Sequence, residues 1–265
     1  MRSILVIALL CVATAQAQPD IVRDEYKAPD YARDGNRAPD YAREKRWAEE
    51  ITPGLVVGDA VYLQQKSGHK FLALYAEANP ARAAVIVVHG LGVHPDWALI
   101  GALRSGLADH NYATLSIQMP VRAADALGEE YPALFPDAAE RIAVAIAFLK
   151  SKDHQKIALV AHSMGARMSN FFLARTPGNA IAAWIAIGIS NGNFMDADKL
   201  RAPILDIYGE RDFPQVRQNA EARAAVLRKL KGSAQVEVAG ADHYFAGSEQ
   251  SLTAQIRRFL DRKFN

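Results

Sequence analysis

The stretch that decides the fold is Lys-Ile-Ala-Leu-Val-Ala-His-Ser-Met-Gly, residues 156–165. Its four apolar residues 157–160 are too few for a helix and predict a buried strand, whereas the apolar spacing of the residues after the stretch predicts a helix. Ser163 therefore stands on a tight turn between a strand and a helix. Ala161 and Gly165 are small enough for the close approach that such a turn requires. Taken alone, the stretch also fits a serine that caps a helix.

The first residues have the pattern of a secretory signal peptide. A positive start at Arg2, an apolar run at 4–12 and an Ala-x-Ala site ending at Ala17 predict a signal peptide at 1–17. About nine apolar residues are too few to cross a bilayer, which needs roughly twenty. We therefore expect an exported protein, periplasmic or secreted, without a stable membrane span.

Composition narrows the classes of function. The formal net charge of +2 favours neither nucleic acid nor an acidic surface as a partner. The single cysteine, Cys11, lies in the predicted signal peptide, so the exported chain lacks thiols for disulfides, catalysis or metal binding. The sequence has neither the His, Asp and Glu spacing of a metal site nor a glycine-rich phosphate loop. We expect no metal and no cofactor.

Residues 18–50 are charged and carry a near repeat. The segment Lys-Ala-Pro-Asp-Tyr-Ala-Arg-Asp at 27–34 returns as Arg-Ala-Pro-Asp-Tyr-Ala-Arg-Glu at 37–44. Two copies are fewer than a stacked repeat array needs, which favours a solvated linker or two short helical turns begun by Pro-Asp. The alternative is an arm that presents Tyr-Ala-Arg units to a partner in the cell envelope. We expect the folded domain at residues 51–265.

Strand and helix patterns alternate through this domain. Alternating residues around a Ser-Gly turn predict an antiparallel edge hairpin at 59–65 and 70–76. Apolar runs predict buried strands at 83–88, 113–117, 181–189 and 204–208, and a short strand at 236–238. Helices are predicted at 97–107, 137–150, 219–230 and 252–264, and a long loop at 119–135. The fold class is α/β, a doubly wound, mainly parallel sheet with an N-terminal hairpin.

Candidate catalytic groups lie at the carboxyl ends of the predicted strands, where ligands bind in such sheets. Asp212 follows the strand at 204–208, and His243 follows the strand at 236–238. The chain order Ser163, Asp212, His243 is the order of nucleophile, acid and base in one class of serine hydrolases. We expect His243 to accept the serine proton and Asp212 to hold the imidazole ring.

Other polar residues near these positions fit the catalytic roles less well. Asp206 lies within an apolar strand, which favours a structural role. Asp242 adjoins His243 and could act as the acid only with an unusual backbone bend. His162 precedes the serine and is best interpreted as a packed histidine of the turn.

Two backbone N–H groups are expected to form an oxyanion hole. Met164 directly follows the serine, and Leu91 follows His-Gly at the end of the strand at 83–88. Their N–H groups would stabilise the negative charge that develops on an attacked carbonyl oxygen. His94 and Trp97 could line the pocket, although Pro95-Asp96 also fits a helix cap with the indole in the core. The residues predicted to bind substrate are His94, Trp97, Tyr131 and Phe135.

Several segments of the sequence that include or adjoin these positions resemble those of a known family. They are Ala-His-Ser-Met-Gly around Ser163, His-Gly-Leu-Gly-Val-His-Pro-Asp-Trp at 89–97, Thr-Leu-Ser-Ile-Gln-Met-Pro at 114–120, Pro-Ile-Leu-Asp-Ile-Tyr-Gly at 203–209 and Gly-Ala-Asp-His at 240–243. With them, the chain from about residue 52 to 265 resembles the α/β-hydrolase superfamily, although Ala161 stands where the usual pentapeptide has glycine. The phrases are similar to an exported bacterial branch catalogued as a domain of unknown function. The resemblance implies the triad and oxyanion roles above and no particular substrate.

The spacing also bears on the mouth of the site. Only about a dozen residues, 190–202, separate two predicted strands, so we expect no helical cap there and an open site covered by the loop at 119–135. We expect an exported serine hydrolase, a carboxylesterase or related acyl hydrolase, acting on a small-molecule or polymer-attached acyl substrate through an acyl-enzyme. The alternatives are a non-catalytic envelope binding protein on a hydrolase scaffold and an acyltransferase that uses the same site.

Overall fold

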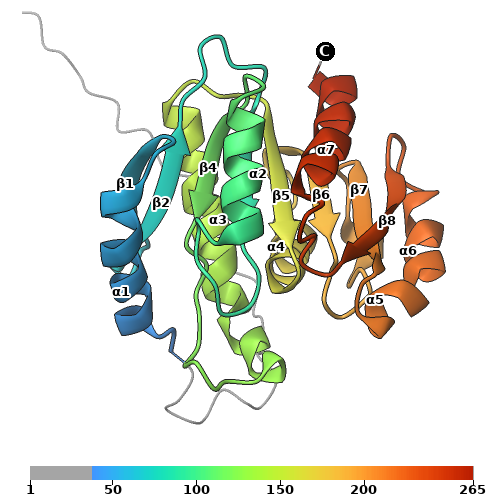
Figure 1. Ribbon diagram of the computed structural model, residues 1–265, viewed down its shortest axis with the longest axis horizontal. Helices are drawn as coiled ribbons and strands as arrows, with labels where there is room; N and C mark the ends of the chain where they lie inside the picture. Colours follow the sequence, from blue (N-terminus) through green and yellow to red (C-terminus); the bar gives the residue numbers. More distant parts are fainter. Residues whose placement is uncertain (1–37, 265) are drawn as a thin grey trace, which may run out of the picture.

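The computed structural model describes residues 38–264, in which helices cover both faces of one twisted sheet (Figure 1). The predicted signal peptide at 1–17 and the first copy of the repeat at 27–34 lie outside the described residues. Within the described part, no helix is both long enough and apolar enough to cross a membrane.

The sheet has eight strands in the order β1-β2-β4-β3-β5-β6-β7-β8. β1 pairs antiparallel with β2 and β2 with β4, and every other pairing is parallel. The predicted fold class, a mainly parallel α/β sheet with an N-terminal hairpin, is confirmed. The strands are β1 (Asp59–Gln64), β2 (Lys70–Ala76), β3 (Ala84–Val88), β4 (Ala113–Ile117), β5 (Ile157–His162), β6 (Ile181–Ile187), β7 (Ile204–Arg211) and β8 (Ala234–Asp242).

The core has two layers because side chains of the central strands alternate between the faces of the sheet. Ile86 and Val88 of β3 pack with α3 (Phe135–Ser151) and α4 (Met164–Arg175). Val85 and Val87 pack on the opposite face with α2 (Ala98–Ala108) and α7 (Glu249–Phe264). All residues of β3 are buried, which explains why this strand reads as one continuous apolar run.

The predicted elements that differ most from the structure are the helix at 219–230 and the strand at 236–238. The helix predicted at 219–230 is two helices, α5 (Pro214–Gln218) and α6 (Ala220–Leu227). They separate at Asn219, whose side-chain amide donates to the carbonyl of Gln215 at 2.8 Å and competes with continued helix. The strand predicted at 236–238 extends over the whole of β8.

The loops at the mouth of the sheet are mostly irregular. The predicted loop at 119–135 contains the 3-10 helix η3 (Gly128–Leu134). The segment at 190–202, which joins β6 to β7, consists of turns and the short 3-10 helix η4 (Ala197–Lys199).

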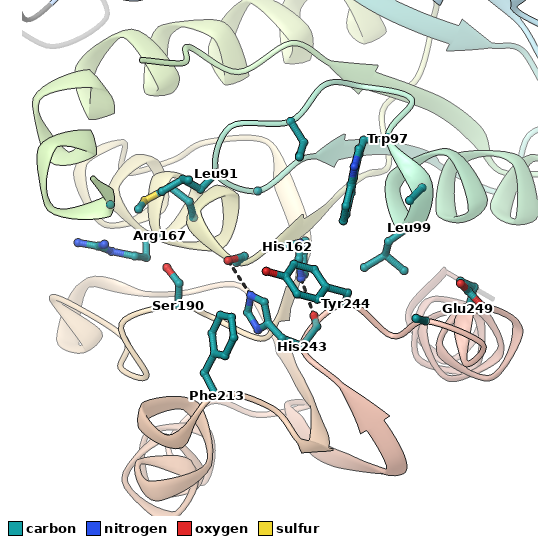
Figure 2. Close-up of a pocket in the computed structure, with 17 residues that line it drawn as sticks. Leu91, Trp97, Leu99, His162, Arg167, Ser190, Phe213, His243, Tyr244 and Glu249 are labelled. Atoms are coloured by element: carbon teal, nitrogen blue, oxygen red, sulfur yellow. Dashed lines mark hydrogen bonds between the residues drawn. The ribbon is translucent and has the colours of Figure 1, made fainter. Parts of the chain in front are cut away.

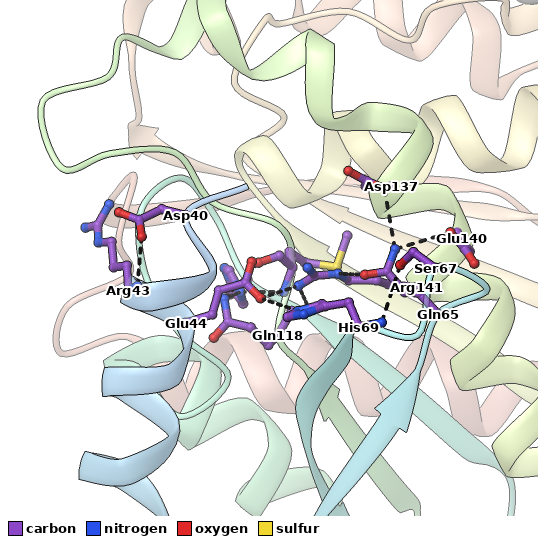
Figure 3. A network of polar contacts seen from close by, with 12 residues as sticks. Asp40, Arg43, Glu44, Gln65, Ser67, His69, Gln118, Asp137, Glu140 and Arg141 are labelled. Carbon is purple, nitrogen blue, oxygen red and sulfur yellow. Dashed lines mark hydrogen bonds and ion pairs between the residues drawn. The ribbon is translucent and has the colours of Figure 1, made fainter. Parts of the chain in front are cut away.

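The N-terminal helix α1 (Tyr41–Ile51) corrects the predicted start of the folded domain at residue 51. Asp40 caps α1 by accepting from the backbone N–H of Arg43 at 2.9 Å, as expected of helical turns begun by Pro-Asp. Ala48 packs against β2, and Glu44 is buried in an ion pair with Arg141 of α3 (Figure 3). The second copy of the repeat therefore belongs to the fold, together with the 3-10 helix η2 (Thr52–Gly54) that follows α1.

Candidate active site

Ser163 lies on a strained turn between β5 and α4. Its backbone has φ 54° and ψ −116°, a conformation that non-glycine residues rarely adopt and that marks functional sites. A β-carbon at Gly165 would collide with the backbone carbonyl of His89 and with the side chain of Val88. The small residue predicted at position 165 is thus required by the contact of α4 with β3.

The three predicted catalytic side chains meet above the carboxyl end of the sheet. Figure 2 shows the ring of His243 among the residues of the adjoining pocket. Nδ1 of His243 lies 2.6 Å from Oδ1 of Asp212, and Nε2 lies 2.9 Å from Oγ of Ser163. Because a carboxylate only accepts hydrogen bonds, Nδ1 carries the proton and Nε2 accepts from the serine hydroxyl. Asp212 is held in turn by the backbone N–H of Phe213, at 2.7 Å from the same oxygen.

Gly188, which follows β6, makes room for this arrangement. Its φ is +51°, and a β-carbon there would lie 2.9 Å from Oδ2 of Asp212 and 3.1 Å from Nδ1 of His243. In the sequence, Gly188 falls within the predicted strand at 181–189. A glycine in an apolar run is the sequence feature that points to such a close approach.

The rival acids and the neighbouring histidine have other partners. Asp206 is fully buried and pairs with Arg223 at 2.8 Å, which agrees with its predicted structural role. Asp242 accepts from the backbone N–H of Tyr244 at 2.9 Å. His162 is packed in the turn, as predicted, and its Nε2 donates to the carbonyl of His243 at 2.9 Å. His162 thereby fixes the backbone of the residue that binds the serine.

The loop after β3, residues 89–93, is termed the oxyanion loop here. His89 is buried, its Nε2 accepts from the N–H of Met119 at 2.8 Å, and its Nδ1 donates to the carbonyl of Gly90 at 2.8 Å. Burial lowers the pKa of His89 to about 3, so the ring is neutral. The carbonyl of Gly90 and the N–H of Leu91 belong to one trans peptide and point in opposite directions, so His89 also orients that N–H.

Gly92 of the oxyanion loop is held from two sides. The guanidinium of Arg43 donates to its carbonyl at 2.9 Å. On the other side, the hydroxyl of Tyr131 accepts from the N–H of Arg122 at 3.3 Å and lies 4.0 Å from the β-carbon position of Gly92. Tyr131, predicted to bind substrate, is therefore buried beneath the loop and supports it instead.

A cavity of about 620 Å³ opens beside Ser163. Trp97 and both predicted oxyanion residues line it, whereas His94, Tyr131 and Phe135 do not. His94 packs on Trp47, with ring centroids 5.7 Å apart, and Phe135 packs on Phe171 at 5.7 Å. His94 and Phe135 therefore lie outside the lining of this cavity, and each packs against a neighbouring aromatic ring. The main apolar and aromatic walls are Leu91, Val93, Trp97, Leu99, Phe213 and Tyr244.

Two wall residues that the sequence analysis missed adjoin the candidate catalytic residues. Phe213 follows Asp212 and stacks on the ring of His243, with centroids 4.0 Å apart. Tyr244 follows His243 and meets the ring of Trp97 edge-on at 6.0 Å. Their adjacency in sequence is a feature that could have identified them. Within residues 38–264, no group of three His, Cys, Asp or Glu side chains is arranged to hold a metal ion.

The sheet order and the serine on the strand-to-helix turn define an α/β-hydrolase fold. The chain belongs to the family described as "Protein of unknown function (DUF3530)", which matches residues 2–140 and 132–262. No curated protein matches the chain.

Solved structures similar to this chain are α/β hydrolases and esterases. Dienelactone hydrolase from Anabaena variabilis has 20% identity and a TM-score of 0.62, over 78% of this chain and 97% of that one. Est1E from Butyrivibrio proteoclasticus has 17% identity and a TM-score of 0.61, over 77% and 98%. XC6422 from Xanthomonas campestris, an α/β serine hydrolase without lid, has 15% identity and a TM-score of 0.61, over 78% and 95%. At these identities the likeness shows the fold.

Proposed function

We propose that this protein is an exported serine hydrolase that cleaves esters, a carboxylesterase or related acyl hydrolase. The observation that carries the proposal is the hydrogen-bonded series from Asp212 through His243 to Ser163, with N···O distances of 2.6 and 2.9 Å. This geometry lets the imidazole accept a proton from the hydroxyl while the carboxylate stabilises the imidazolium that forms.

The reaction has two halves that use the same groups. Oγ of Ser163 attacks the ester carbonyl as its proton passes to Nε2 of His243. The bond to the leaving oxygen then breaks, and the imidazolium returns the proton to that oxygen, so an alcohol departs and an acyl-enzyme remains. Water repeats the sequence with its own oxygen as the nucleophile, which releases the acid and restores the serine.

The N–H groups of Leu91 and Met164 are the proposed donors to the carbonyl oxygen as it becomes negative. Both residues line the cavity at Ser163. The N–H of Met164 lies at the start of α4, where the helix dipole also favours negative charge. Their backbone positions support a role in acyl transfer.

An activity-based probe tests the nucleophile and the acid. We expect a fluorophosphonate probe to label the parent protein and to leave Ser163→Ala unlabelled. Asp212→Asn should fold normally and hydrolyse a chromogenic ester about 10⁴-fold more slowly, because the ring loses its correct tautomer. Asp198→Asn, an exposed acid of η4, is the matched control and should keep parental activity. Equal labelling of Ser163→Ala and the parent would refute the nucleophile.

Export is the second part of the proposal and rests on the pattern at residues 1–17. We expect protein recovered from a bacterial periplasm to begin at Gln18, as measured by intact mass. A full-length mass from the cytoplasmic fraction alone would contradict it.

A further inference from the structure

One cation in the candidate active site has no counter-ion. Arg167 lies on α4, one helical turn after Ser163, is half-buried and lines the same cavity. Its guanidinium lies 5.5 Å from the ring centroid of Phe135. Within residues 38–264, no carboxylate or carbonyl oxygen is hydrogen-bonded to it, so the cavity holds an unpaired positive charge.

Three more deeply buried arginines within residues 38–264 are each paired with a carboxylate. Arg104, Arg141 and Arg223 lie 2.6, 3.0 and 2.8 Å from carboxylate oxygens. Burial lowers the pKa of Arg167, but the guanidinium of an arginine stays charged at neutral pH. A partly desolvated cation without an anion is unfavourable, and an anion brought by a ligand would relieve that strain.

A second unsatisfied group lies in the same cavity. Oγ of Ser190 is buried and has no hydrogen-bond partner within the described residues. Figure 2 shows Ser190 and Arg167 on the same side of His243, and both line the cavity. A guanidinium offers two parallel N–H donors and a hydroxyl offers a third, which suits the two oxygens of a carboxylate.

The opposite side of the cavity has a different character. Trp97 and Leu99 form an apolar wall there, and the carboxylate of Glu249 lies beyond them (Figure 2). A negative group on a ligand would be repelled at Glu249 and attracted at Arg167. The charges therefore orient a substrate with one anionic end.

We propose that the substrate is an ester bearing a carboxylate, which Arg167 and Ser190 bind while the ester carbonyl lies at Ser163. This inference rests on the proposed function and adds its substrate class. The carboxylate belongs to either the acyl or the alcohol part, and two pairs of test esters distinguish these sources.

The experiment compares each carboxylate ester with its neutral carboxamide twin. The acyl pair is 4-nitrophenyl hemiglutarate and the matching glutaramide ester. The alcohol pair is the butanoyl ester of 4-hydroxybenzoate and that of 4-hydroxybenzamide. The measured quantity is the ratio of kcat/KM for the carboxylate ester to that for its twin. In the parent protein we expect a ratio above one in one pair.

Arg167→Met keeps the length of the side chain and removes its charge. It should lower that ratio about 10- to 100-fold, the usual effect of losing hydrogen bonds to a charged group. Arg167→Lys and Ser190→Ala should lower it less, because each retains part of the donor set. Arg228→Met, which removes an exposed arginine paired with Glu221, should leave the ratio unchanged.

Unchanged ratios in Arg167→Met for both pairs would overturn the substrate class while the hydrolase itself stands. A parent protein that hydrolyses no ester and takes up no fluorophosphonate would overturn the proposed function, and the substrate class with it. Turnover of the neutral esters also shows that each variant is folded, so a lower ratio of kcat/KM values is not mistaken for unfolding of the variant.

Discussion

The guanidinium of Arg43 donates to the carbonyl oxygen of Gly92 at 2.9 Å, which ties the N-terminal helix to the oxyanion loop. The same side chain donates to the carbonyl of Arg122 at 3.0 Å and lies 4.5 Å from the ring centroid of Trp47. Gly92 directly follows Leu91, whose N–H is a proposed oxyanion donor. A residue outside the predicted domain thus supports the loop that would stabilise the transition state.

Arg43→Met should therefore lower kcat for a neutral ester by about tenfold with little change in KM. The physical reason is that a displaced oxyanion donor weakens binding of the transition state more than binding of the ground state. Steady-state kinetics on the full chain measure both constants. Lys45→Met, an exposed change on the same helix, is the control and should match the parent. A change confined to KM would contradict this role.

Gly188→Ala should remove most of the proposed ester hydrolysis. The alanine methyl would press on Asp212 and His243, and the φ of +51° disfavours any residue with a β-carbon. We expect kcat/KM to fall at least about 100-fold, because small displacements in a catalytic constellation are costly. Gly178→Ala provides the control, since its φ is +69° and nothing lies near its β-carbon position. If the two variants lost activity equally, backbone strain and not crowding would be the cause.

His162→Gln should carry a stability penalty that shrinks in acid. Burial and the nearby His243 lower the pKa of His162 from 6.5 to about 4, despite opposing effects of the His243 carbonyl and Asp212. Between those pH values the unfolded chain binds the proton and the folded chain does not, so the folded parent loses stability as pH falls. Urea unfolding should show the penalty smaller by about 1 kcal/mol at pH 5.5 than at pH 7. A penalty independent of pH would contradict the lowered pKa.

The buried Glu44–Arg141 pair should behave as a coupled unit. Arg141 also donates to the carbonyl of Gln118 and to the side chain of Gln65, each at 3.0 Å (Figure 3). Burial raises the pKa of Glu44, although Arg141 opposes the rise. Arg141→Met should lower the free energy of unfolding by about 3–5 kcal/mol, since it removes the guanidinium paired with a buried carboxylate and leaves that carboxylate its contact with His69 at 3.3 Å.

The double variant Glu44→Met with Arg141→Met tests that coupling. It should lose less stability than the sum of the two single changes, by at least about 1 kcal/mol, because neither charge is left unpaired. Denaturant titrations of all four proteins give the coupling energy. Additive losses would mean that the two groups do not stabilise each other.

The sequence predicted the features that depend on local pattern. The apolar runs located the central strands, and the turn at Ser163 fixed which sheet edge carries the site. Asp212 and His243 each follow a predicted parallel strand. Because the carboxyl ends of parallel strands lie at the same edge of the sheet, both residues were predicted at the edge that carries Ser163.

What the sequence did not predict depends on contacts between distant segments. The sequence around an aromatic loop residue such as Tyr131 or Phe135 does not indicate whether its ring faces a ligand or a neighbouring helix. Likewise, nothing local in the charged N-terminal stretch indicates that Glu44 enters the core, because its partner Arg141 lies far along the chain.

Because Arg141 is buried and pairs with Glu44, the folded domain must include the helix α1 that carries Glu44. A chain shortened to begin after Glu44 would enclose the Arg141 guanidinium without its ion-pair partner and would leave the oxyanion loop without Arg43. Although α1 lies outside the domain predicted from the sequence, its removal would therefore disturb both the core and the oxyanion loop.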